Sequence, residues 1–389
     1  MIGKSTLRRR ARRSAMAVVT VLAAGAIVAP VAEAAIVHST PVPTYQTNGR
    51  VNAIVIQNGV IYIGGRFTAV RPAGSSSASV TRNHVAALSQ ATGQVLPWDP
   101  NANGTVQALA ASGGRVYLGG SFSNVGGTSR TRLAAVDATT GAVVPGFNPR
   151  PDAAVSSLAV SGSTLYAGGS FLNVSGTPRA NLAAFDATTG ALSTTWAPAA
   201  DDVVKGVDMA ADGSRVYVAG NFTTINGTSH RHVAALDPTS GVPVASFSHG
   251  LAYAVVDMAV DASGVFIAGA GGGGNFADLN LTTGATVWQG GTDGNVQAIA
   301  TLDGEVYVGG HYDNYCGMQG GQHTCTTAVT RHKLLAVDEA TGALTSWDPH
   351  ANSALGVFAL TGSGTTLTAG GDFTRIGSRA QQGFAEFTE

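Results

Sequence analysis

The 389-residue sequence predicts an all-β fold, a seven-bladed β-propeller of four-stranded antiparallel blades. Three observations carry this prediction. A segment of the type RVYLGGSF, residues 115–122, recurs along the chain; a turn motif ending in Thr-Gly or Ser-Gly follows most copies; and no stretch beyond residue 34 keeps a helical period. Repeated units of about 50 residues made of short alternating segments are typical of propeller blades.

Paired small residues mark the seven copies of the recurring segment. They are Gly64-Gly65, Gly119-Gly120, Gly168-Gly169, Ala219-Gly220, Ala268-Gly269, Gly309-Gly310 and Gly370-Gly371. The third unit shows the whole pattern, with VSSLAVSG, TLYAGGSF, NLAAFD and ALSTTWAP separated by turn residues. Period-two alternation bounded by Gly, Asn, Asp and Ser predicts four strands in each unit.

The turn motif is one copy short, and this shortage predicts how the ring closes. The units span about residues 50–104, 105–152, 153–201, 202–250, 251–294, 295–352 and 353–389. The motif ends at Gly93, Gly141, Gly190, Gly241, Gly284 and Gly342, so the last unit lacks its fourth strand. An exposed sheet edge is a site of unwanted pairing. We therefore expect residues 36–47 to complete the last blade, which makes residues 35–389 one domain.

The first 34 residues have the order of regions of a secretory signal peptide. Lys4 and five arginines precede an apolar run over residues 15–31, and Ala32-Glu33-Ala34 follows as a cleavage signal. Export through the twin-arginine route, suggested by Arg12-Arg13, and an uncleaved membrane anchor remain alternatives. The sequence thus predicts a secreted or cell-surface-associated protein whose mature chain does not insert into the membrane.

The charge balance of the mature chain disfavours two classes of partner. Six of the 22 Lys and Arg residues and one of the 23 Asp and Glu residues lie in the first 34 positions. The remainder carries 16 basic and 22 acidic side chains, a net charge near −6. Nucleic acids and anionic membranes bind clustered Lys and Arg. We therefore expect an extracellular glycan or protein as partner, and a monomeric chain.

The glycine pairs favour a structural interpretation over a phosphate-binding loop. Phosphate loops place their glycines before a helix whose N-terminal amides bind the anion. Here each pair ends an alternating strand and no helical pattern follows, and glycine in a strand marks a bulge or the close approach of another backbone. In the Asp-x-Thr-Thr-Gly motif, Asp opens a turn with its own side chain and Gly takes the positive-φ position.

The full repeat has a recognisable pattern. It consists of an alternating strand, [VL]Y-x-GG-x-F, a G-T-x-R-like loop, LAA-x-D-x-x-TG and a closing aromatic residue. This pattern resembles the delta-60 repeat propellers of exported bacterial proteins over nearly all of residues 50–389, and the resemblance implies a secreted propeller without implying catalytic residues. The hairpin VDEATGALTSW is also similar to the tryptophan-bearing hairpin of quinoprotein propellers, but the chain lacks their adjacent cysteines. We expect no cofactor.

The only two cysteines, Cys316 and Cys325, lie in one long insertion of the sixth unit. An even pair in one loop of an exported chain predicts a disulfide. The alternative is a metal site that uses Cys316, His323 and Cys325 with His311 or His332. The spacing matches no common zinc pattern, so we expect the disulfide and no metal at this loop.

Two insertions point to one face of the propeller as the binding surface. Residues 71–83 and 313–330 both lie between the second and third strands of their units, on the face that also carries the connections between blades. Variable loops on a rigid scaffold commonly carry function. The ligand-binding candidates on this face are Arg66, His311, Asp313, Tyr315 and Asp372. Arg82, Arg130, Arg179 and Arg331 recur before the third strand, which indicates a scaffold role.

The function that these features favour is non-enzymatic binding of an extracellular glycan or protein through that face. A hydrolase or lyase acting on glycans or lactones is the first alternative, with Asp208, Asp257, His311 and Asp313 as its catalytic candidates. We expect Asp208 and Asp257 to occupy the same strand position in adjacent units, within VDMA of both, where they are bonded to backbone amides or bind a cation such as Ca²⁺. A structural cell-surface module is the second alternative.

Overall fold

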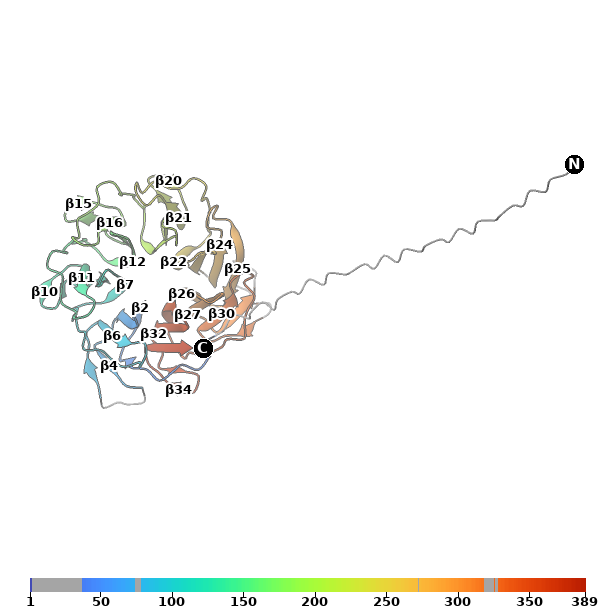
Figure 1. Ribbon diagram of the computed structural model, residues 1–389, viewed down its shortest axis with the longest axis horizontal. Coiled ribbons are helices and arrows are strands. Elements are labelled where there is room, and N and C mark those ends of the chain that lie inside the picture. Colours follow the sequence, from blue (N-terminus) through green and yellow to red (C-terminus); the bar gives the residue numbers. More distant parts are fainter. Residues whose placement is uncertain (2–36, 74–77, 272, 318–324, 326–327) are drawn as a thin grey trace. The chain divides into compact units, whose positions relative to one another are not determined.

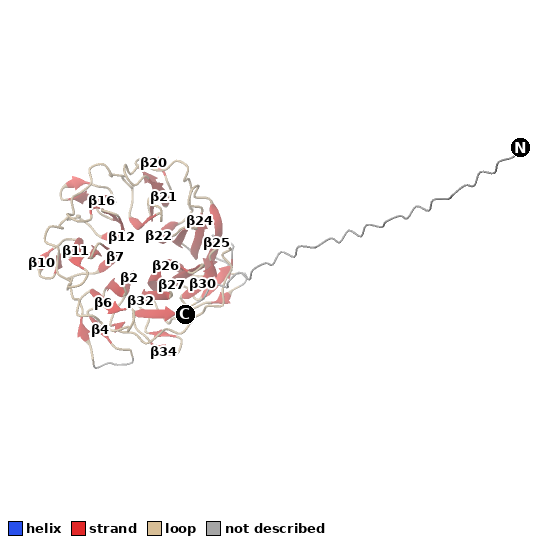
Figure 2. Cartoon of the chain, viewed as in Figure 1, coloured by secondary structure: helices blue, strands red, loops and turns tan. Residues whose placement is uncertain are grey.

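The computed structural model describes residues 1, 37–73, 78–271, 273–317, 325 and 328–389. Every regular element in these residues is a β-strand, as Figure 2 shows, which confirms the all-β prediction. Within the same residues no helix has the length and apolar character needed to cross a membrane. The predicted signal peptide and parts of both insertions lie outside the described residues.

The strands fall into repeated sets of three, joined as inner, middle and outer strands of antiparallel sheets. The inner strands are β2 (Val51–Gln57), β7 (Val106–Ser112), β12 (Val155–Ser161), β17 (Val204–Met209), β22 (Ala254–Val260), β26 (Asn295–Leu302) and β31 (Val357–Ser363). The middle strands are β3 (Val60–Gly65), β8 (Arg115–Gly120), β13 (Thr164–Gly169), β18 (Val216–Gly220), β23 (Val265–Ala270), β27 (Glu305–His311) and β32 (Thr366–Gly371). The outer strands are β6 (Val85–Ser89), β11 (Leu133–Asp137), β16 (Leu182–Asp186), β21 (Val233–Leu236), β24 (Gly274–Leu279), β30 (Leu334–Asp338) and β35 (Phe384–Thr388).

Short hairpins occupy the loops between middle and outer strands. They are β4 (Ala69–Arg71) with β5 (Val80–Thr81), β9 (Asn124–Val125) with β10 (Thr128–Ser129), β14 (Asn173–Val174) with β15 (Thr177–Pro178), β19 (Thr224–Ile225) with β20 (Thr228–Ser229), β28 (Asn314–Gly317) with β29 (Val329–Thr330), and β33 (Arg375–Ile376) with β34 (Arg379–Ala380). β1 (Gln46–Thr47) pairs with β4, and β25 (Thr286–Thr292) joins β24 to β28 in a longer sheet.

The sheets stand around a central opening (Figure 1), and each inner strand contacts the next one along the chain. β31 in turn contacts β2, so the order of contacts closes on itself. The hydrophobic core lies between neighbouring sheets. For example, Tyr62 and Val85 of one set share a cluster with Val116 and Leu118 of the next. The protein is therefore held together by sheet-to-sheet interfaces of one repeated type.

The fourth segment of most units is shorter than the sequence predicts. In five sets it makes a single bridge to the outer strand, as between Leu88 and Val95 or between Val136 and Val143, and only β25 is a full strand at this place in the described chain. The segment leaves the sheet because its aromatic residue is buried between units: Trp98, for instance, is only 2% exposed. Burial of the indole ring thus replaces part of the ladder pairing.

The N-terminal segment runs beside the outer strand of the last set. The His38 amide donates to the Thr388 carbonyl oxygen at 2.9 Å, and the Val42 amide donates to that of Glu386 at 2.8 Å. Val37 packs in the same core cluster as Phe387 and Trp347. This segment therefore covers the outer edge of β35.

In the second unit both glycines of the pair are required by packing, which supports the structural interpretation. A Cβ at Gly119 would lie 2.8 Å from Cγ1 of Val155 on the next inner strand. A Cβ at Gly120 would overlap the carbonyl oxygen of Thr105 and lie 3.0 Å from the Cα of Val106. The first glycine therefore lets two sheets approach, and the second lets the chain entering the inner strand cross the middle strand.

The turn motif also behaves as predicted and links neighbouring units. Asp137 Oδ1 accepts the amides of Thr139 and Thr140 at 3.0 and 2.7 Å, and Gly141 has φ +75°. From the preceding unit, the Trp98 indole donates to the Asp137 carbonyl oxygen and the Tyr62 hydroxyl donates to that of Ala138. The recurring Tyr and the closing Trp therefore form hydrogen bonds between neighbouring units and also pack in the hydrophobic core.

Candidate functional site

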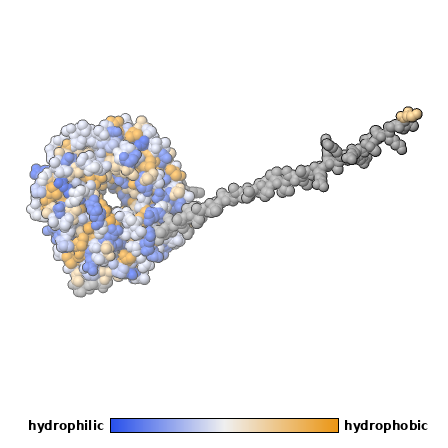
Figure 3. All heavy atoms as spheres, in the orientation of Figure 1, coloured by the Kyte–Doolittle hydropathy of each residue, from blue (hydrophilic) through white to orange (hydrophobic). Residues whose placement is uncertain are grey.

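The inner strands surround an axial cavity of about 380 Å³. Figure 3 shows the hollow in the middle of the molecule, with hydrophilic and hydrophobic residues at its margin. The residues that line the cavity come from the first half of the inner strands. These strand starts follow the connections between units, so the cavity lies toward the same face as the loops between middle and outer strands.

A β-bulge in each inner strand aims one side chain at the axis. In every inner strand the register shifts after the first Val, and the residue in the bulge has no partner on the middle strand. A bulge bends the strand and turns a side chain away from the regular ladder. The bulge residues all line the cavity: Asn52, Gln107, Ser156, Lys205, Val256, Gln297 and Phe358.

This ring of bulge residues is the part of the repeat that differs most in chemistry. It combines one cation, several neutral hydrogen-bonding groups and two apolar side chains. Lys205, Gln107 and Ser156 make no side-chain hydrogen bond or ion pair with the described residues, and Asn52 makes one long bond, from Nδ2 to the Val106 carbonyl oxygen at 3.4 Å. The framework repeats around the axis, whereas the groups that face the cavity do not.

Asp257 lines the axial cavity, and Asp208 lies on the preceding inner strand; both are bonded to the backbone. Asp257 Oδ2 accepts the amide of Ile299 on the next inner strand at 3.0 Å. Asp208 Oδ1 and Oδ2 accept the amides of Met209 at 2.8 Å and Val260 at 2.9 Å. Burial raises the pKa of Asp208 to about 6 and that of Asp257 to about 7. Both carboxyl groups therefore connect adjacent sheets.

The expected equivalence of these two aspartates is wrong. Asp257 pairs with Ala268, whereas Asp208 pairs with Tyr217, and Gly206 holds the position opposite Ala219 that corresponds to Asp257. The shared VDM string is displaced by two residues between the two units, and a displacement by two keeps the side chain on the same face of the strand. The shift arises because the connection between β17 and β18 is two residues longer than that between β22 and β23.

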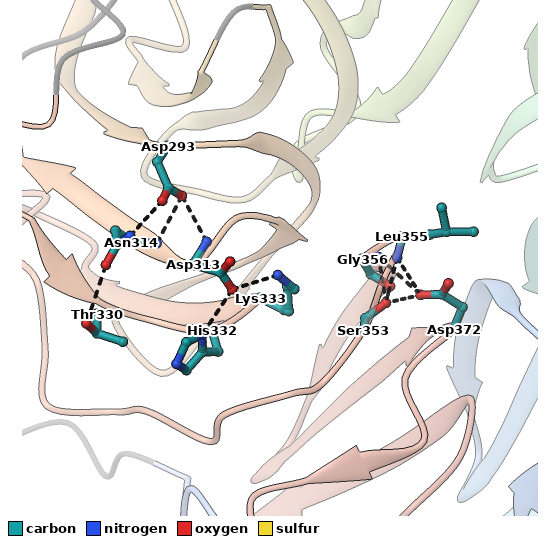
Figure 4. Close-up of polar contacts among 10 residues, drawn as sticks. All are labelled: Asp293, Asp313, Asn314, Thr330, His332, Lys333, Ser353, Leu355, Gly356 and Asp372. Atoms are coloured by element: carbon teal, nitrogen blue, oxygen red, sulfur yellow. Dashed lines mark hydrogen bonds and ion pairs between the residues drawn. The ribbon is translucent and has the colours of Figure 1, made fainter.

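The Arg66 side of the rim carries a second group of charges. The Arg50 guanidinium carbon lies 4.0 Å from the ring centroid of Phe358, which lines the cavity. Asp372 Oδ1 accepts the amides of Leu355 and Gly356 at 3.3 and 3.1 Å and the hydroxyl of Ser353, as Figure 4 shows. Burial lowers the pKa of Arg50; the charge of Asp372 opposes this shift and that of Arg66 adds to it. Arg66 itself is exposed.

The cysteine loop carries the third group. Asp313 Oδ1 lies 2.7 Å from Lys333 Nζ and 3.0 Å from His332 Nδ1 (Figure 4), and these hydrogen bonds lower the pKa of Asp313. His311 is exposed at the end of β27. Tyr315 is only 6% exposed and packs against Phe276. Its ring therefore supports the sheet and does not face a ligand from solvent.

The predicted disulfide between Cys316 and Cys325 is present. It closes the insertion next to β28, whose pairing with β25 anchors the loop to the preceding unit. In the described part of the chain no group of three or more His, Cys, Asp and Glu side chains is placed to hold a metal ion. His323, part of the alternative metal set, lies outside the described residues.

Sequence reasoning missed an Asx residue that shapes the loop face. Asn103 Oδ1 accepts the amides of Ser123 and Asn124, both at 2.9 Å, and so ties the start of an inner strand to the loop after the middle strand. The same pair of bonds is made in other units by Asn48, Asp152, Asp201, Asp293 and Asn352. In most units the residue stands three positions before the first Val of the inner strand, a spacing that the sequence contains.

The recurring arginines have the scaffold role that their repetition indicates. Arg82 donates from Nη1 to the Thr81 carbonyl oxygen at 2.8 Å and from Nη2 to that of Leu96 at 2.9 Å. Arg130, Arg179 and Arg331 make the corresponding bonds in their own units. These arginines are bound to backbone oxygens and are not the residues that distinguish one unit from another.

The candidates do not form one cluster. Arg66 and Asp372 meet around Arg50, and His311 and Asp313 lie at the cysteine loop. Asp257 lines the cavity and Asp208 lies on the neighbouring inner strand; burial of Asp257 and, to a smaller extent, the charge of Asp208 both raise the pKa of Asp257. No hydrogen bond or ion pair among the described residues joins the two inner aspartates to His311 or Asp313. The hydrogen bonds and ion pairs of the described residues therefore do not connect the four residues proposed for catalysis, which stay a prediction.

Comparisons with known proteins establish the fold and nothing finer. No protein-family model matches this chain, and no curated protein sequence matches it significantly. The WD40 repeats of RRP9 match with a TM-score of 0.62 at 14% identity, over 92% of this chain and 99% of that chain. The WD40 β-propeller domain of Doa1 matches with a TM-score of 0.56 at 13% identity, over 89% and 97%.

A computationally designed protein, Ika8, matches with a TM-score of 0.52 at 15% identity, over 90% of this chain and 99% of that one. The two WD40 structures confirm that the chain is a repeat protein of the β-propeller type. Identities of 13–15% carry no information about ligands. The resemblance to delta-60 repeats and the similarity to quinoprotein hairpins stay predictions.

Proposed function

We propose that this chain is an exported, non-enzymatic propeller that binds an extracellular ligand, a glycan or a protein, through the face that carries the axial cavity and the two insertions. The observation that carries the proposal is the ring of bulge residues. One backbone position recurs around the axis while its side chains change from Lys to Gln, Ser, Val and Phe. A purely structural channel has no need for this variety, because the glycines, tyrosines and arginines of the same units do recur.

Seven blades in one closed ring are part of this proposal. What supports seven is the set of seven inner strands in mutual contact, from β2 round to β31 and back to β2. What supports closure by the N-terminal segment is the pair of amide bonds from His38 and Val42 to β35. A ring of this kind holds the bulge residues at fixed positions, and preorganised groups bind at lower entropic cost.

Export and the secreted location rest on the basic and apolar pattern of residues 1–34 and on the disulfide. A structural disulfide persists in oxidising compartments, so the bond between Cys316 and Cys325 is compatible with an extracellular site. The proposal requires no cofactor and treats the mature chain as a monomer.

The test is binding of residues 35–389 to a glycan array and to proteins of an extracellular extract, with matched variants on the two faces. Arg66→Ala and His311→Ala remove exposed side chains from the loop face. Val242→Ala removes an exposed side chain, 57% accessible, from the turn between the third and fourth segments, on the opposite face. We expect the two loop-face variants to lose at least fivefold in affinity and Val242→Ala to lose none. Equal behaviour of all three variants contradicts the proposed face.

The hydrolase or lyase alternative has one specific observation in its favour. Asp257 lines the axial cavity, and its pKa of about 7 leaves it partly protonated at neutral pH, as a general acid requires. Turnover by the wild-type protein in a screen of glycosides and lactones, abolished by Asp257→Asn, supports the enzyme. Binding of a ligand without turnover supports the binding protein.

A further inference from the structure

The axial cavity presents hydrogen-bond donors that the described protein leaves without partners. The Lys205 ammonium, the Gln107 amide and the Ser156 hydroxyl all line it and bond to no described side chain or backbone group. Gln297 Oε1 is buried against Gly356 and accepts no hydrogen bond in the described chain. The amide nitrogen of Gln297 is therefore the atom that can donate a hydrogen bond into the cavity. Groups of this kind are satisfied by water or by a ligand.

The charges in the cavity favour an anion. Lys205 and Asp257 are its only charged lining residues in the described chain. The Asp257 carboxylate is turned to the wall, where Oδ2 accepts the Ile299 amide and the Met258 amide supplies a further hydrogen bond. Lys205 has no such counterpart. An incoming carboxylate therefore finds a free ammonium, and charge-assisted hydrogen bonds are stronger than neutral ones.

The other residues that line the cavity indicate which chemical groups the ligand carries besides its carboxylate. Gln107, Ser156 and Gln297 can exchange hydrogen bonds with hydroxyl groups. Val256 and Phe358 add apolar surface to the cavity lining, and the Arg50 guanidinium lies over the Phe358 ring. A sugar ring has hydroxyl groups at its edge and C–H groups on its face. The volume of about 380 Å³ falls within the usual range for small-ligand pockets, roughly 300–1,000 Å³.

We propose that the axial cavity binds a carboxylate-bearing sugar residue, a hexuronic acid at the end of an anionic glycan. Its carboxylate pairs with Lys205, and its hydroxyl groups bond with Gln107, Ser156 and Gln297. A single ammonium matches a single carboxylate charge better than the two charges of a phosphate group. This inference rests on the proposed function, because it names the ligand class for the same face, while the outer loops bind the rest of the glycan.

The chain offers an unusually clean test, because Lys205 and Lys333 are its only lysines beyond residue 34. Calorimetry with residues 35–389 compares glucuronic acid and trigalacturonic acid with glucose and maltotriose. We expect binding of the acidic sugars only, weakened at least tenfold by Lys205→Met. Lys333→Met is the matched control, since the Lys333 ammonium lies at Asp313 on the loop and not in the cavity. Thermal unfolding of each variant verifies that it is folded.

Amine acetylation gives a second readout that does not depend on mutation. Mass spectrometry of the labelled protein reports the two lysines separately, and trigalacturonic acid is expected to protect Lys205 and leave Lys333 unchanged. Unaltered affinity in Lys205→Met, or equal protection of both lysines, overturns the inference. So does equal or tighter binding of glucose, of inorganic phosphate, or of an acetylated dipeptide with a free carboxylate.

The outcomes separate this inference from the proposed function. If Arg66→Ala and His311→Ala abolish capture of a neutral glycan or a protein while Lys205→Met binds it normally, the cavity assignment fails and the binding function stands. If the wild-type chain retains no glycan and no protein in any of these assays, the proposed function itself fails.

Discussion

Replacement of Gly120 by alanine tests the packing role of the second glycine in each pair. A Cβ at this position would overlap the carbonyl oxygen of Thr105 and lie 3.0 Å from the Cα of Val106. Both are backbone atoms next to the bulge at Gln107, so a side-chain rotation cannot relieve the clash. Either the entry of β7 or the end of β8 must move, with loss of the local ladder bonds.

The expected cost follows from overpacking in well-packed interiors, about 3 kcal/mol for a clash with backbone. With an unfolding entropy of about 2.1 cal/mol/K per residue, the chain from residue 35 has about 0.7 kcal/mol/K, so the melting temperature is expected to fall by about 4 °C. The movement also shifts Gln107, and ligand affinity is expected to fall with stability.

Gly146 provides the matched control in the same unit. A Cβ there meets no heavy atom within 4 Å, and its φ is not in the left-handed region. Gly146→Ala is expected to be neutral or to stabilise by about 0.5 kcal/mol, because alanine restricts the unfolded chain. Melting curves of both variants by circular dichroism decide the matter. If Gly120→Ala melts no lower than Gly146→Ala, the packing explanation of the paired glycines is refuted.

The other predictions concern buried charge, links between units and the disulfide. Burial raises the pKa to about 7 in three side chains that are at most 5% exposed: Asp278, Glu305 and Glu386. In the native state these three groups hold protons that the unfolded state releases above pH 4. Their contribution to stability is therefore fully present below about pH 4 and is lost as pH rises through 7. Asp278→Asn is expected to weaken this pH dependence and to raise the free energy of unfolding at pH 8 by about 2 kcal/mol. Denaturant unfolding at several pH values measures both effects. An unchanged pH profile contradicts the raised pKa of Asp278. Tyr117→Phe removes the hydrogen bond from the Tyr117 hydroxyl to the Ala187 carbonyl oxygen and is expected to lower the free energy of unfolding by about 1 kcal/mol. Phe266 occupies the position of this tyrosine in the fifth unit, and Phe266→Tyr is not expected to raise the free energy of unfolding by the same amount. Reduction of the Cys316–Cys325 disulfide opens a loop with a sequence separation of 9 and is expected to lower the free energy of unfolding by about 2–3 kcal/mol. Melting curves with and without reductant measure this loss. An unchanged melting temperature would show that other contacts constrain the loop.

Local features of this protein could be predicted from the sequence, because the conformation of each depends on only a few neighbouring residues. The Asp137 turn needs only an Asx side chain, two following amides and a glycine with φ +75°. Cys316 and Cys325 stand close enough in one loop to form a disulfide whatever surrounds them. Repetition of these local signals then predicted a stacked repeat fold, because units that cannot bury their own faces must stack on one another.

The candidate site could be predicted only in part, because its residues depend on contacts between segments that are far apart in the chain. Arg66 and His311, which were predicted because they follow glycine pairs, are exposed on the loop face, but Tyr315 is buried against Phe276 once β28 pairs with β25. The Asx residues that hold the loops, such as Asn103, stand at a regular spacing that could have been recognised.

The sequence by itself determined the all-β repeat, the structural role of the glycines and the disulfide, since these depend on residue type and spacing along the chain. Only the tertiary structure decided which side chains face the axis. The connection between β17 and β18 is two residues longer than that between β22 and β23, so the identical VDM strings of Asp208 and Asp257 fall two positions apart, and the bulge of β17 turns Lys205 into the cavity. Strand register is set by pairing with a neighbour, and that information exists only once the sheets have formed.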